Sequence, residues 1–379
     1  MSESQAAAPK RATPLRIRCA RFDDYQQVSD LESRYGLESK PREEWEHLWL
    51  NNPVYEDLAG TWPMGWVLED SNDKIAGYIG NIPLYYELGG KRYLTATSRA
   101  WVVDAEHRSY SLLLLDYFFS QKAVDLYLTT SLNNEAFEGF QTFAPSRVPV
   151  GDWDRSRFWI TNYSGFAFSW LKMNKVPFAS ALKYPLSAGM ILKDILEGKR
   201  FQSSDKGHEL RFCAGFDEGF DIFWNELKKR RRHVLLGERT RDVLQWHFKY
   251  ALMRYEAWIV CSFKQSRLCA YSIFYRQDNT RLGLTRMRLA DFQTLEDDHS
   301  LLLNMLLCVL DRCRKTGIHM LEIVGISREN AQVVDLAKPY RRKLGSWLSF
   351  YKTANSQLVS SLSDANTWDL SCFDGDTSL

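Results

Sequence analysis

The sequence predicts an α/β (α+β) fold with two mixed sheets, each made of an antiparallel meander, a crossover helix and a parallel strand. Apolar runs with strand periodicity, separated by short turns, occur in the same order in both halves of the chain. The spacing between the halves is nearly constant, because Trp66 and Trp258 lie 192 residues apart and Tyr78 and Tyr271 lie 193 apart. Repetition of this element order over roughly 70 residues indicates a duplicated unit.

In the first copy, three apolar runs form the meander, and the turns between them are Asp70–Asp73 and Gly89–Gly90. A helix then crosses to a buried strand, which forms a parallel pair with the last strand of the meander. Along the chain we expect strands at 15–19, 65–69, 74–86, 91–103 and 124–130, helices between 20 and 50, and helices at 111–122 and 133–143.

The second copy repeats this order. Its turns are expected at Lys264–Arg267 and Gln277–Thr280. The expected elements are strands at 258–263, 268–275, 282–292 and 318–324, with a helix at 300–315 before the last strand.

The domain organisation follows from length and local composition. A chain of 379 residues is too long for one ordinary core, so two domains are expected. The glycine, serine and charged residues of Gly198–Asp205 mark the linker, and Trp368, Leu370 and Phe373 predict that the polar C-terminal tail docks before it frays. The expected segments are a disordered tail at 1–14, an N-terminal domain at 15–200, a C-terminal domain at 201–355 and a C-terminal tail at 356–379.

Composition excludes several classes of function. The net charge of +2 argues against broad electrostatic capture of DNA or of an anionic membrane, so a site for a polyanion must be local. The seven cysteines contain no C-x-x-C pair, which predicts reduced thiols and no zinc site. No apolar run approaches the roughly 18 residues of a membrane span. We therefore expect a cytoplasmic protein without metal.

The most informative segment is Ala100–Leu115, where an apolar strand runs through a basic residue, Arg108, into an apolar helix. The first amides of a helix lack intrahelical partners and the helix dipole is positive there, so a diphosphate is stabilised at such a junction. The alternative is that Arg108 is only a solvated residue at a helix start.

This segment resembles motif A of the GNAT acyltransferases, in which an R/Q-x-x-G-x-G/A loop wraps the pyrophosphate of coenzyme A. Val103 and Arg108 occupy the motif's positions, but Ser111 replaces the first glycine and Leu113 the second small residue. Glycine lets the backbone approach a phosphate without a Cβ in the way, so these departures weaken the motif. The whole architecture resembles a tandem GNAT protein.

The resemblance implies an acyl-CoA site in the N-terminal domain. The pantetheine would pair with the backbone of Trp101, Val102 and Val103, and the pyrophosphate with the loop that begins at Arg108. The loop residues that would bind the pyrophosphate are Arg108, Ser109, Tyr110, Ser111, Leu112 and Leu113. Asn133 would hydrogen-bond the cofactor or its loop, or else cap a helix.

Acyl transfer also needs a base for the acceptor amine and a donor for the departing thiolate. The family takes the donor from a tyrosine in an N-x-x-A-x-x-x-Y pattern, and here Phe140 occupies that place and cannot donate a proton. We expect Tyr163 to replace it, or departure to be unassisted. Asp104, at the end of the strand, is the predicted base, with helix capping as its alternative role.

Two further segments bear on function. In the second copy the corresponding turn is Gln293–His299, whose acidic residues would repel a diphosphate, so no CoA site is expected there. The basic run Lys228–His233 could hold phosphate-rich ligands such as RNA. A tandem GNAT fold also looks like the FemAB-type aminoacyl transferases that use charged tRNA, although a solvated helix end explains the run as well.

The sequence thus predicts an N-acyltransferase that moves an acetyl or other acyl group from acyl-CoA to a primary amine of a small molecule, such as an amino sugar. Its alternatives are a non-catalytic GNAT-fold binding or assembly protein and a FemAB-like aminoacyl transferase using charged tRNA. No DNA partner is expected and tRNA is the least favoured partner. The oligomeric state, the acceptor and the length of the acyl chain stay open.

Overall fold

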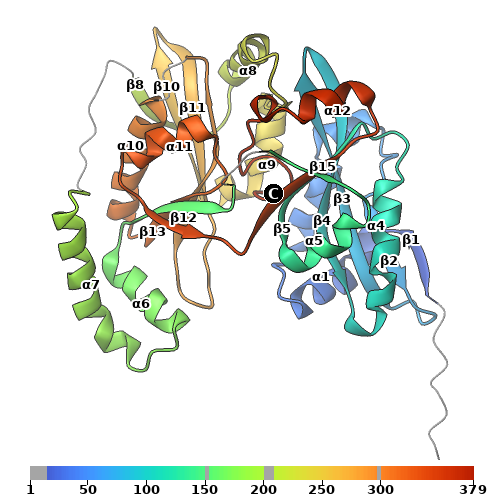
Figure 1. The fold of residues 1–379 in the computed structure, drawn as a ribbon, viewed down its shortest axis with the longest axis horizontal. Coiled ribbons are helices and arrows are strands. Elements are labelled where there is room, and N and C mark those ends of the chain that lie inside the picture. The colour runs from blue at the N-terminus through green and yellow to red at the C-terminus, as the bar shows by residue number, and fades with distance from the viewer. Residues whose placement is uncertain (1–14, 150–152, 200–208, 297–299) are drawn as a thin grey trace, which may run out of the picture.

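The computed structural model describes residues 15–149, 153–199, 209–296 and 300–379. The predicted disordered tail at 1–14, most of the predicted linker and His299 lie outside the described residues. Two mixed sheets stand side by side, and the C-terminus lies between them (Figure 1). The prediction of two mixed sheets is therefore confirmed.

The first sheet has the strand order β1-β2-β3-β4-β5-β15-β6, with β9 paired to the end of β3. All neighbours are antiparallel except β4 and β5, which form the predicted parallel pair. Its strands are β1 Arg16–Cys19, β2 Gly65–Glu69, β3 Ile75–Leu88, β4 Lys91–Val103, β5 Leu126–Asn133, β15 Ser346–Lys352, β6 Ser146–Arg147 and β9 Leu236–Gly237.

The second sheet has the order β8-β10-β11-β12-β13-β7-β14, and β12 and β13 are its parallel pair. Its strands are β8 Glu209–Cys213, β10 Ala257–Lys264, β11 Arg267–Arg276, β12 Arg286–Thr294, β13 Met320–Ile323, β7 Arg155–Ile160 and β14 Tyr340–Lys343. The two orders match strand for strand. Trp66 and Trp258 lie on the corresponding strands β2 and β10, and Tyr78 and Tyr271 on β3 and β11.

The helices follow the predicted order in both copies. In the first copy α4 crosses between β4 and β5, and in the second α10 crosses between β12 and β13. The helices are α1 Tyr25–Arg34, α2 Arg42–Leu50, α3 Pro53–Asp57, α4 Ser111–Phe119, α5 Asn134–Gln141, α6 Tyr163–Met173, α7 Ala179–Leu196, α8 Glu218–Arg230, α9 Arg241–Met253, α10 Ser300–Thr316, α11 Arg328–Asp335 and α12 Ser356–Leu362.

The copies exchange one strand each. β7 belongs to the first half of the chain but lies in the second sheet, and β15 belongs to the second half but completes the first sheet. A division near residue 200 therefore cuts through both sheets, which corrects the simple picture of two separate domains. Local periodicity identifies a strand but carries no information about which sheet it joins.

A buried carboxylate fixes β7 in the second sheet. Glu322 on β13 is fully buried, and Ser156 on β7 donates to it at 2.5 Å. Arg288 and Arg342 also donate to this carboxylate, at 2.5 Å each. Burial raises the pKa of Glu322, but these guanidinium groups and Arg286 outweigh it and hold the pKa at about 2.

The two halves share one apolar core. The largest buried cluster joins Trp45 and Trp49 of α2 to Phe248 of α9 and to Tyr271 of β11. The predicted docking of the C-terminal tail is also confirmed, because Trp368, Leu370 and Phe373 are all buried.

Candidate functional site

The first candidate feature is the place where β4 and β5 diverge. The parallel strands pair only at Thr95 with Leu126 and at Ala96 with Tyr127. Beyond that point no described strand pairs with this edge of β4. We call this divergence the first fork. Backbone groups on an unpaired strand edge are available to an extended ligand.

A β-bulge lies in β4 at the first fork. The register with β3 shifts between Tyr78, which pairs with Val102, and Gly80, which pairs with Arg99. Ala100 within the bulge has a φ of 54°, a conformation that costs a residue with a Cβ about 1 kcal/mol or more. Bulges re-aim strand backbone and are common beside active sites. Alanine has no preference for this conformation, so the sequence carried no signal for the bulge.

The predicted pantetheine residues lie on this bulged end of β4. Val102 and Val103 are buried and pair with β3, whereas the Trp101 ring is half-buried. The indole Nε1 of Trp101 is buried and has no hydrogen-bond partner among the described residues. Trp101 packs edge-on against Phe140, with ring centroids 5.4 Å apart. Phe140 therefore underlies the first fork, as the sequence predicted.

The predicted pyrophosphate loop is a 3-10 turn, Ala105–Tyr110, that continues into α4. In such a turn each amide donates to the carbonyl three residues before it, and the Ser111 amide donates to the Arg108 carbonyl. The amides expected to hold a diphosphate are thus engaged within the turn. The Arg108 side chain is exposed and has no ion pair with a described residue, while Leu112 and Leu113 are 39% and 47% exposed.

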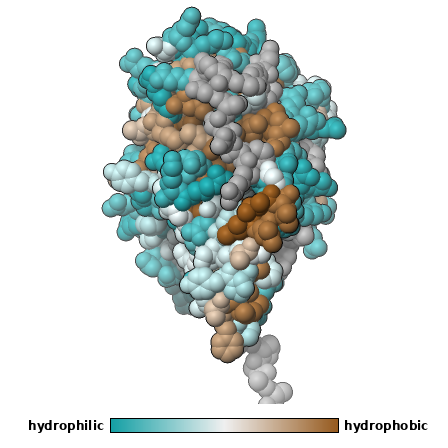
Figure 2. Space-filling model, turned by 90° about the vertical axis from the view of Figure 1, so that its left-hand side faces the viewer, coloured by the Kyte–Doolittle hydropathy of each residue, from teal (hydrophilic) through white to brown (hydrophobic). Residues whose placement is uncertain are grey.

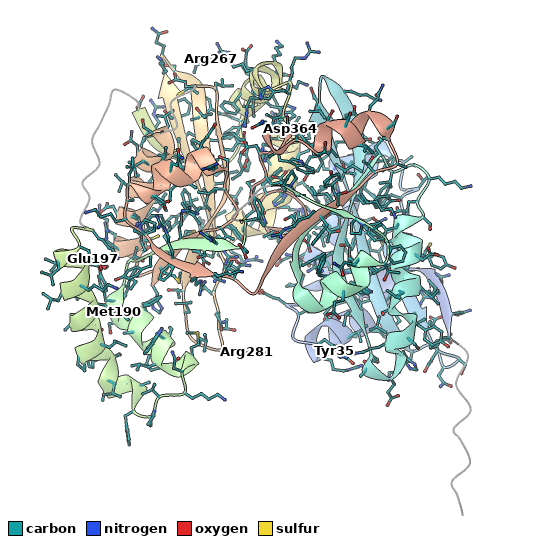
Figure 3. All side chains as sticks on the ribbon, in the orientation of Figure 1. Tyr35, Met190, Glu197, Arg267, Arg281 and Asp364 are labelled. Atoms are coloured by element: carbon teal, nitrogen blue, oxygen red, sulfur yellow. The ribbon has the colours of Figure 1, made fainter. Side chains whose placement is uncertain are left out.

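The predicted base and acid lie apart. Asp104 accepts from Arg34 at 2.6 Å and from the Tyr35 hydroxyl at 3.2 Å, at the edge of the first half (Figure 3). Tyr163 follows β7 and donates to Asp194 on α7 at 2.7 Å, beside the second sheet. The structure does not bring Tyr163 to the first fork. Asn133 ends β5, and its backbone pairs with Ser346.

A loop from the C-terminal tail reaches the first fork instead. The Thr130 hydroxyl on β5 lies 3.3 Å from the Asp374 carbonyl, 3.4 Å from an Asp376 carboxylate oxygen and 3.1 Å from the Thr377 hydroxyl. Gly375 has a φ of 73°, and a Cβ there would lie 2.3 Å from the Thr130 hydroxyl. Only glycine fits this approach.

Asp376 is the carboxylate that this loop brings to Thr130 on β5. Burial raises its pKa to about 6, although Arg99 on β4 and the Thr130 hydroxyl favour the ionised form. A carboxylate with that pKa is mostly ionised at neutral pH and can still accept a proton. It lies in the polar C-terminal tail, where nothing in the local sequence predicts a contact with β5.

Buried polar groups from the first copy surround Arg99. Glu32 on α1 accepts from Arg99 at 3.3 Å, and burial raises the pKa of Glu32. Lys40 is also close, and burial followed by the repulsion of Arg99 lowers its pKa to about 8. The Tyr78 hydroxyl is buried without a partner among the described residues. Of these groups Arg99 acts on Asp376 directly, and its positive charge favours the ionised carboxylate.

The end of this loop is held by one hydrogen bond within the tail and by a contact with His247 on α9. Ser378 donates to the Cys372 carbonyl at 2.8 Å, so the 2.7 Å contact with Nε2 of His247 must use a proton on that nitrogen. Burial lowers the pKa of His247 to about 3. The ring is therefore neutral at pH 7, and it stacks on Phe373 at 4.5 Å.

Comparison with known proteins places this geometry in a wider context. No family model and no curated protein matches the sequence. Solved structures do match in fold. An N-myristoyltransferase from Saccharomyces cerevisiae with bound myristoyl-CoA has a TM-score of 0.57 and 14% identity, over 92% of this chain and 81% of that one.

Two other structures agree with it. A GCN5-related N-acetyltransferase from Anabaena variabilis has a TM-score of 0.52 and 10% identity, over 90% of this chain and 73% of that one. A probable N-acyltransferase from Enterococcus faecalis has a TM-score of 0.54 and 9% identity, over 90% and 72%. The chain has a tandem GNAT-like fold. At these identities the likeness establishes the fold alone.

The second GNAT-like copy has the same fork, but the chain itself fills it. β12 and β13 pair from Arg286 to Arg288 and then diverge, and a bulge lies at Ala290. We call this the second fork. The Phe373 amide donates to the Ala290 carbonyl at 2.9 Å. Residues of β12, the end of β13 and 369–372 leave a cavity of about 10 Å³ there, roughly one water probe.

The filling segment is held by a buried ion cluster. Arg239 donates to Asp291 at 2.8 and 3.1 Å and lies 3.5 Å from Asp374. Tyr271 and Ser371 also donate to Asp291, at 3.1 and 2.9 Å. The cluster is buried, and its single cation, Arg239, faces two carboxylates, of which Asp291 is the nearer.

Most of the basic run Lys228–His233 is exposed, but several of its side chains also contact other parts of the fold. Arg230 donates to the Leu295 carbonyl, Arg231 pairs with Asp369 at 2.6 Å, and Arg232 donates to the Gly89 carbonyl. Lys228 lies 3.5 Å from Glu87. Most of the run therefore joins the copies. Among the described residues no group of three or more His, Cys, Asp or Glu side chains is placed to hold a metal. No helix within them is long and apolar enough to cross a membrane.

Proposed function

We propose that the chain transfers an acyl group from acyl-CoA to an amine at the first fork. Two observations together carry this proposal: β4 has an unpaired, bulged edge, and a carboxylate from the C-terminal tail, Asp376, contacts Thr130 on the diverging strand β5. Acyl-CoA supplies a thioester carbonyl that an amine can attack. The fork offers a backbone edge for the extended pantetheine, and the partnerless Nε1 of Trp101 offers a donor beside it.

Asp376 is the base that this geometry favours over Asp104. An acceptor amine reaches the site as an ammonium group and must lose a proton before its nitrogen attacks the carbonyl carbon. The Asp376 carboxylate, with a pKa of about 6, takes that proton. Asp104 is engaged by Arg34 and by the Tyr35 hydroxyl, so its carboxylate already has two partners.

The developing negative charge is stabilised by backbone. As the C–N bond forms, charge grows on the carbonyl oxygen, and preorganised amides lower the energy of that state. The bulge at Ala100 and Trp101 re-aims the amides of β4, which gives the strained backbone a purpose. The C–S bond then breaks, the CoA sulfur leaves as a thiolate, and the second proton of the attacking nitrogen passes to that thiolate or to solvent, which leaves the neutral amide. Phe140 supplies no proton, so departure is unassisted by the position that the family uses.

The diphosphate is bound by side-chain charge more than by amides. The amides of Arg108–Ser111 are engaged in the 3-10 turn that connects β4 to α4. The guanidinium group of Arg108, in the same turn, is exposed. A single exposed cation binds more weakly than a glycine-rich cradle. We therefore expect modest affinity for CoA, with much of the binding from the pantetheine and acyl chain.

We propose only that the acceptor is an amine and do not assign it to one class of molecule. The sequence suggested a small molecule such as an amino sugar, and the yeast neighbour is an N-myristoyltransferase. The experiment is to mix the purified protein with acyl-CoAs from acetyl to palmitoyl and a panel of amines that includes amino sugars and peptides. Release of free thiol and the mass of the acylated amine are measured. Thiol release that requires the amine supports the proposal, whereas none across the panel favours the non-catalytic alternative.

The aminoacyl-tRNA alternative receives little support from the structure. Arg231 is half-buried and pairs with Asp369, and the exposed Arg232 donates to the Gly89 carbonyl, so both guanidinium groups already have partners within the fold. A gel shift with charged tRNA should therefore show no salt-dependent complex.

A further inference from the structure

The α6–α7 hairpin, residues 163–196, projects from the second sheet at the lower left of Figure 1. Brown apolar surface gathers on the lower part of this side of the molecule (Figure 2). The hairpin and its turn contribute nine large, exposed apolar side chains. They are Trp170, Met173, Phe178, Leu182, Tyr184, Ile191, Leu192, Ile195 and Leu196. Contiguous exposed apolar surface marks a site of interaction.

The amphipathic character of α7 is inverted. A surface helix normally turns its apolar stripe to the core, but the buried residues of α7 are Ser187 and Asp194. Asp194 accepts from Tyr163 at 2.7 Å and from Tyr340 at 2.5 Å. The helix is therefore attached to the protein through its polar side, and its apolar side faces outward.

The turn of the hairpin aims an aromatic ring into solvent. Phe178 has a φ of 57° and its side chain is 83% exposed. Lys175, three residues earlier, has a φ of 54°. The left-handed conformation costs a residue with a Cβ about 1 kcal/mol or more. The strain and the exposure of Phe178 have no explanation inside the fold.

The charges around this apolar face are mostly positive. Residues 163–197 contain four lysines and two carboxylates, which are the buried Asp194 and the capping residue Glu197, 3.8 Å from Lys193. Lys183 lies over the ring of Tyr184, and Lys172 donates to the Arg281 carbonyl on the neighbouring β11–β12 connection. Figure 3 labels Arg281 there and Met190 on α7. The hairpin is thus an apolar face with a cationic rim.

We propose that the α6–α7 hairpin docks on the surface of an anionic phospholipid membrane. An amphipathic helix with apolar groups on one side and lysines beside them binds in the plane of the headgroup region. The aromatic rings of Phe178, Tyr184 and Trp170 suit that boundary, and the lysines complement the lipid phosphates. A second copy is a poorer occupant, because it would bring two cationic rims together.

The test is co-flotation of the full chain with vesicles of phosphatidylcholine alone or with one part in three phosphatidylglycerol. The wild type should float with the anionic vesicles, less so at high salt, and only weakly with the neutral ones. Phe178→Ser, Leu192→Ser and Leu196→Ser together should abolish flotation. The matched control is Met253→Ser, Leu336→Ser and Val359→Ser, three exposed apolar residues elsewhere, and it should float like the wild type.

A second variant tests the charges. Each lysine near an anionic surface contributes enough that Lys175→Gln with Lys183→Gln should weaken partitioning roughly thirtyfold. The control, Lys122→Gln with Lys249→Gln, changes two exposed lysines on other elements and should leave partitioning unchanged. The proposal is overturned if the wild type ignores anionic vesicles or if the triple serine variant still floats. It is also overturned if sedimentation shows a dimer that the triple variant abolishes, because the hairpin would then cover itself with a second copy.

Discussion

The two forks of this protein are built alike and used differently. In each copy a parallel pair of strands diverges and a bulge centred on an alanine, Ala100 or Ala290, turns the backbone of the inner strand. At the second fork the Ala290 carbonyl accepts from Phe373 of the chain's own tail. At the first fork the residue after the alanine is Trp101, whose indole nitrogen has no described partner.

The difference indicates that the two copies of the fork have different roles: the second binds the chain's own tail, and the first is left for a ligand. In the second copy the bulge is followed by Asp291, whose charge is neutralised by Arg239. The tail is anchored there through Phe373, and three residues later Asp376 contacts Thr130 of the first copy. The second fork thus anchors the tail that carries Asp376, the residue that we propose as the base at the first fork. Each prediction below tests one side of this division.

The largest expected effect is on catalysis at the first fork. Asp376→Asn removes the proton acceptor and keeps the shape, so the rate of amine acylation should fall by about 10² to 10⁴. Acyl-CoA binding should persist, which thermal shift with acyl-CoA can show. The wild-type rate should rise with pH and level off above about pH 6, because the deprotonated carboxylate is the active form. A variant with full activity would remove Asp376 from the mechanism.

The same substitution, which should lower the catalytic rate, should raise the stability of the folded protein at neutral pH. Because burial raises the folded pKa of Asp376 to about 6, above its ordinary 3.8, its favourable contribution is complete below pH 3.8 and is lost as pH rises through 6. Asp376→Asn should therefore raise the melting temperature at pH 7.5 and change it little at pH 4. Equal shifts at both pH values would contradict the raised pKa.

The next effect concerns the anchor at the second fork. Asp291→Ala leaves Arg239 buried with only the more distant Asp374, and breaking a buried pair in this way costs about 3–5 kcal/mol. Urea unfolding should show this loss. The exposed pair Lys315–Asp311 provides the control, since Asp311→Ala should cost well under 1 kcal/mol. If Asp291→Ala were equally mild, the tail would not depend on the second fork.

A smaller effect is expected on the melting temperature, because acyl-CoA should bind at the first fork and not at the second. Acyl-CoA at a hundredfold excess over its Kd should stabilise the wild type by about 2.7 kcal/mol, seen as a rise of several degrees in Tm. Arg108→Glu should remove the rise, because it places a negative charge against the diphosphate. Arg328→Glu, at an exposed helix start beside the second fork, should leave it intact. A wild-type Tm that ignores every acyl-CoA would make the first fork vestigial.

Much of the fold follows from local patterns. Element order, the meanders and the parallel pairs could be predicted because period and turn residues are local signals. The exchange of β7 and β15 could not, since it depends on tertiary contacts such as Ser156 with Glu322. Strand partners are chosen by packing that a single sequence does not display.

The site was predictable only in part. Trp101 and Phe140 were named from the motif, and the structure packs their rings together at the first fork, whereas the bulge beside them had no signal in the sequence. Asp376 and the neutral His247 were missed because they act through a tail that folds back over more than 240 residues to Thr130. Tyr163 was expected nearby, but the strand before it joins the other sheet.

The smallest effect probes the packing behind Trp101. A Cβ at Gly139 would lie 2.5 Å from the Trp101 ring, so Gly139→Ala must displace the indole at the first fork. Overpacking of this kind costs about 1–3 kcal/mol. Gly189→Ala, on α7 where nothing lies within 4 Å, should instead stabilise by about 0.5–1 kcal/mol, because alanine favours a helix. Comparing the two in urea unfolding and in acyl-CoA thermal shift separates packing from binding. Gly139→Ala should lose part of the ligand-induced rise in Tm while Gly189→Ala keeps it all. An undiminished rise in Gly139→Ala would mean that Trp101 does not line the acyl-CoA site.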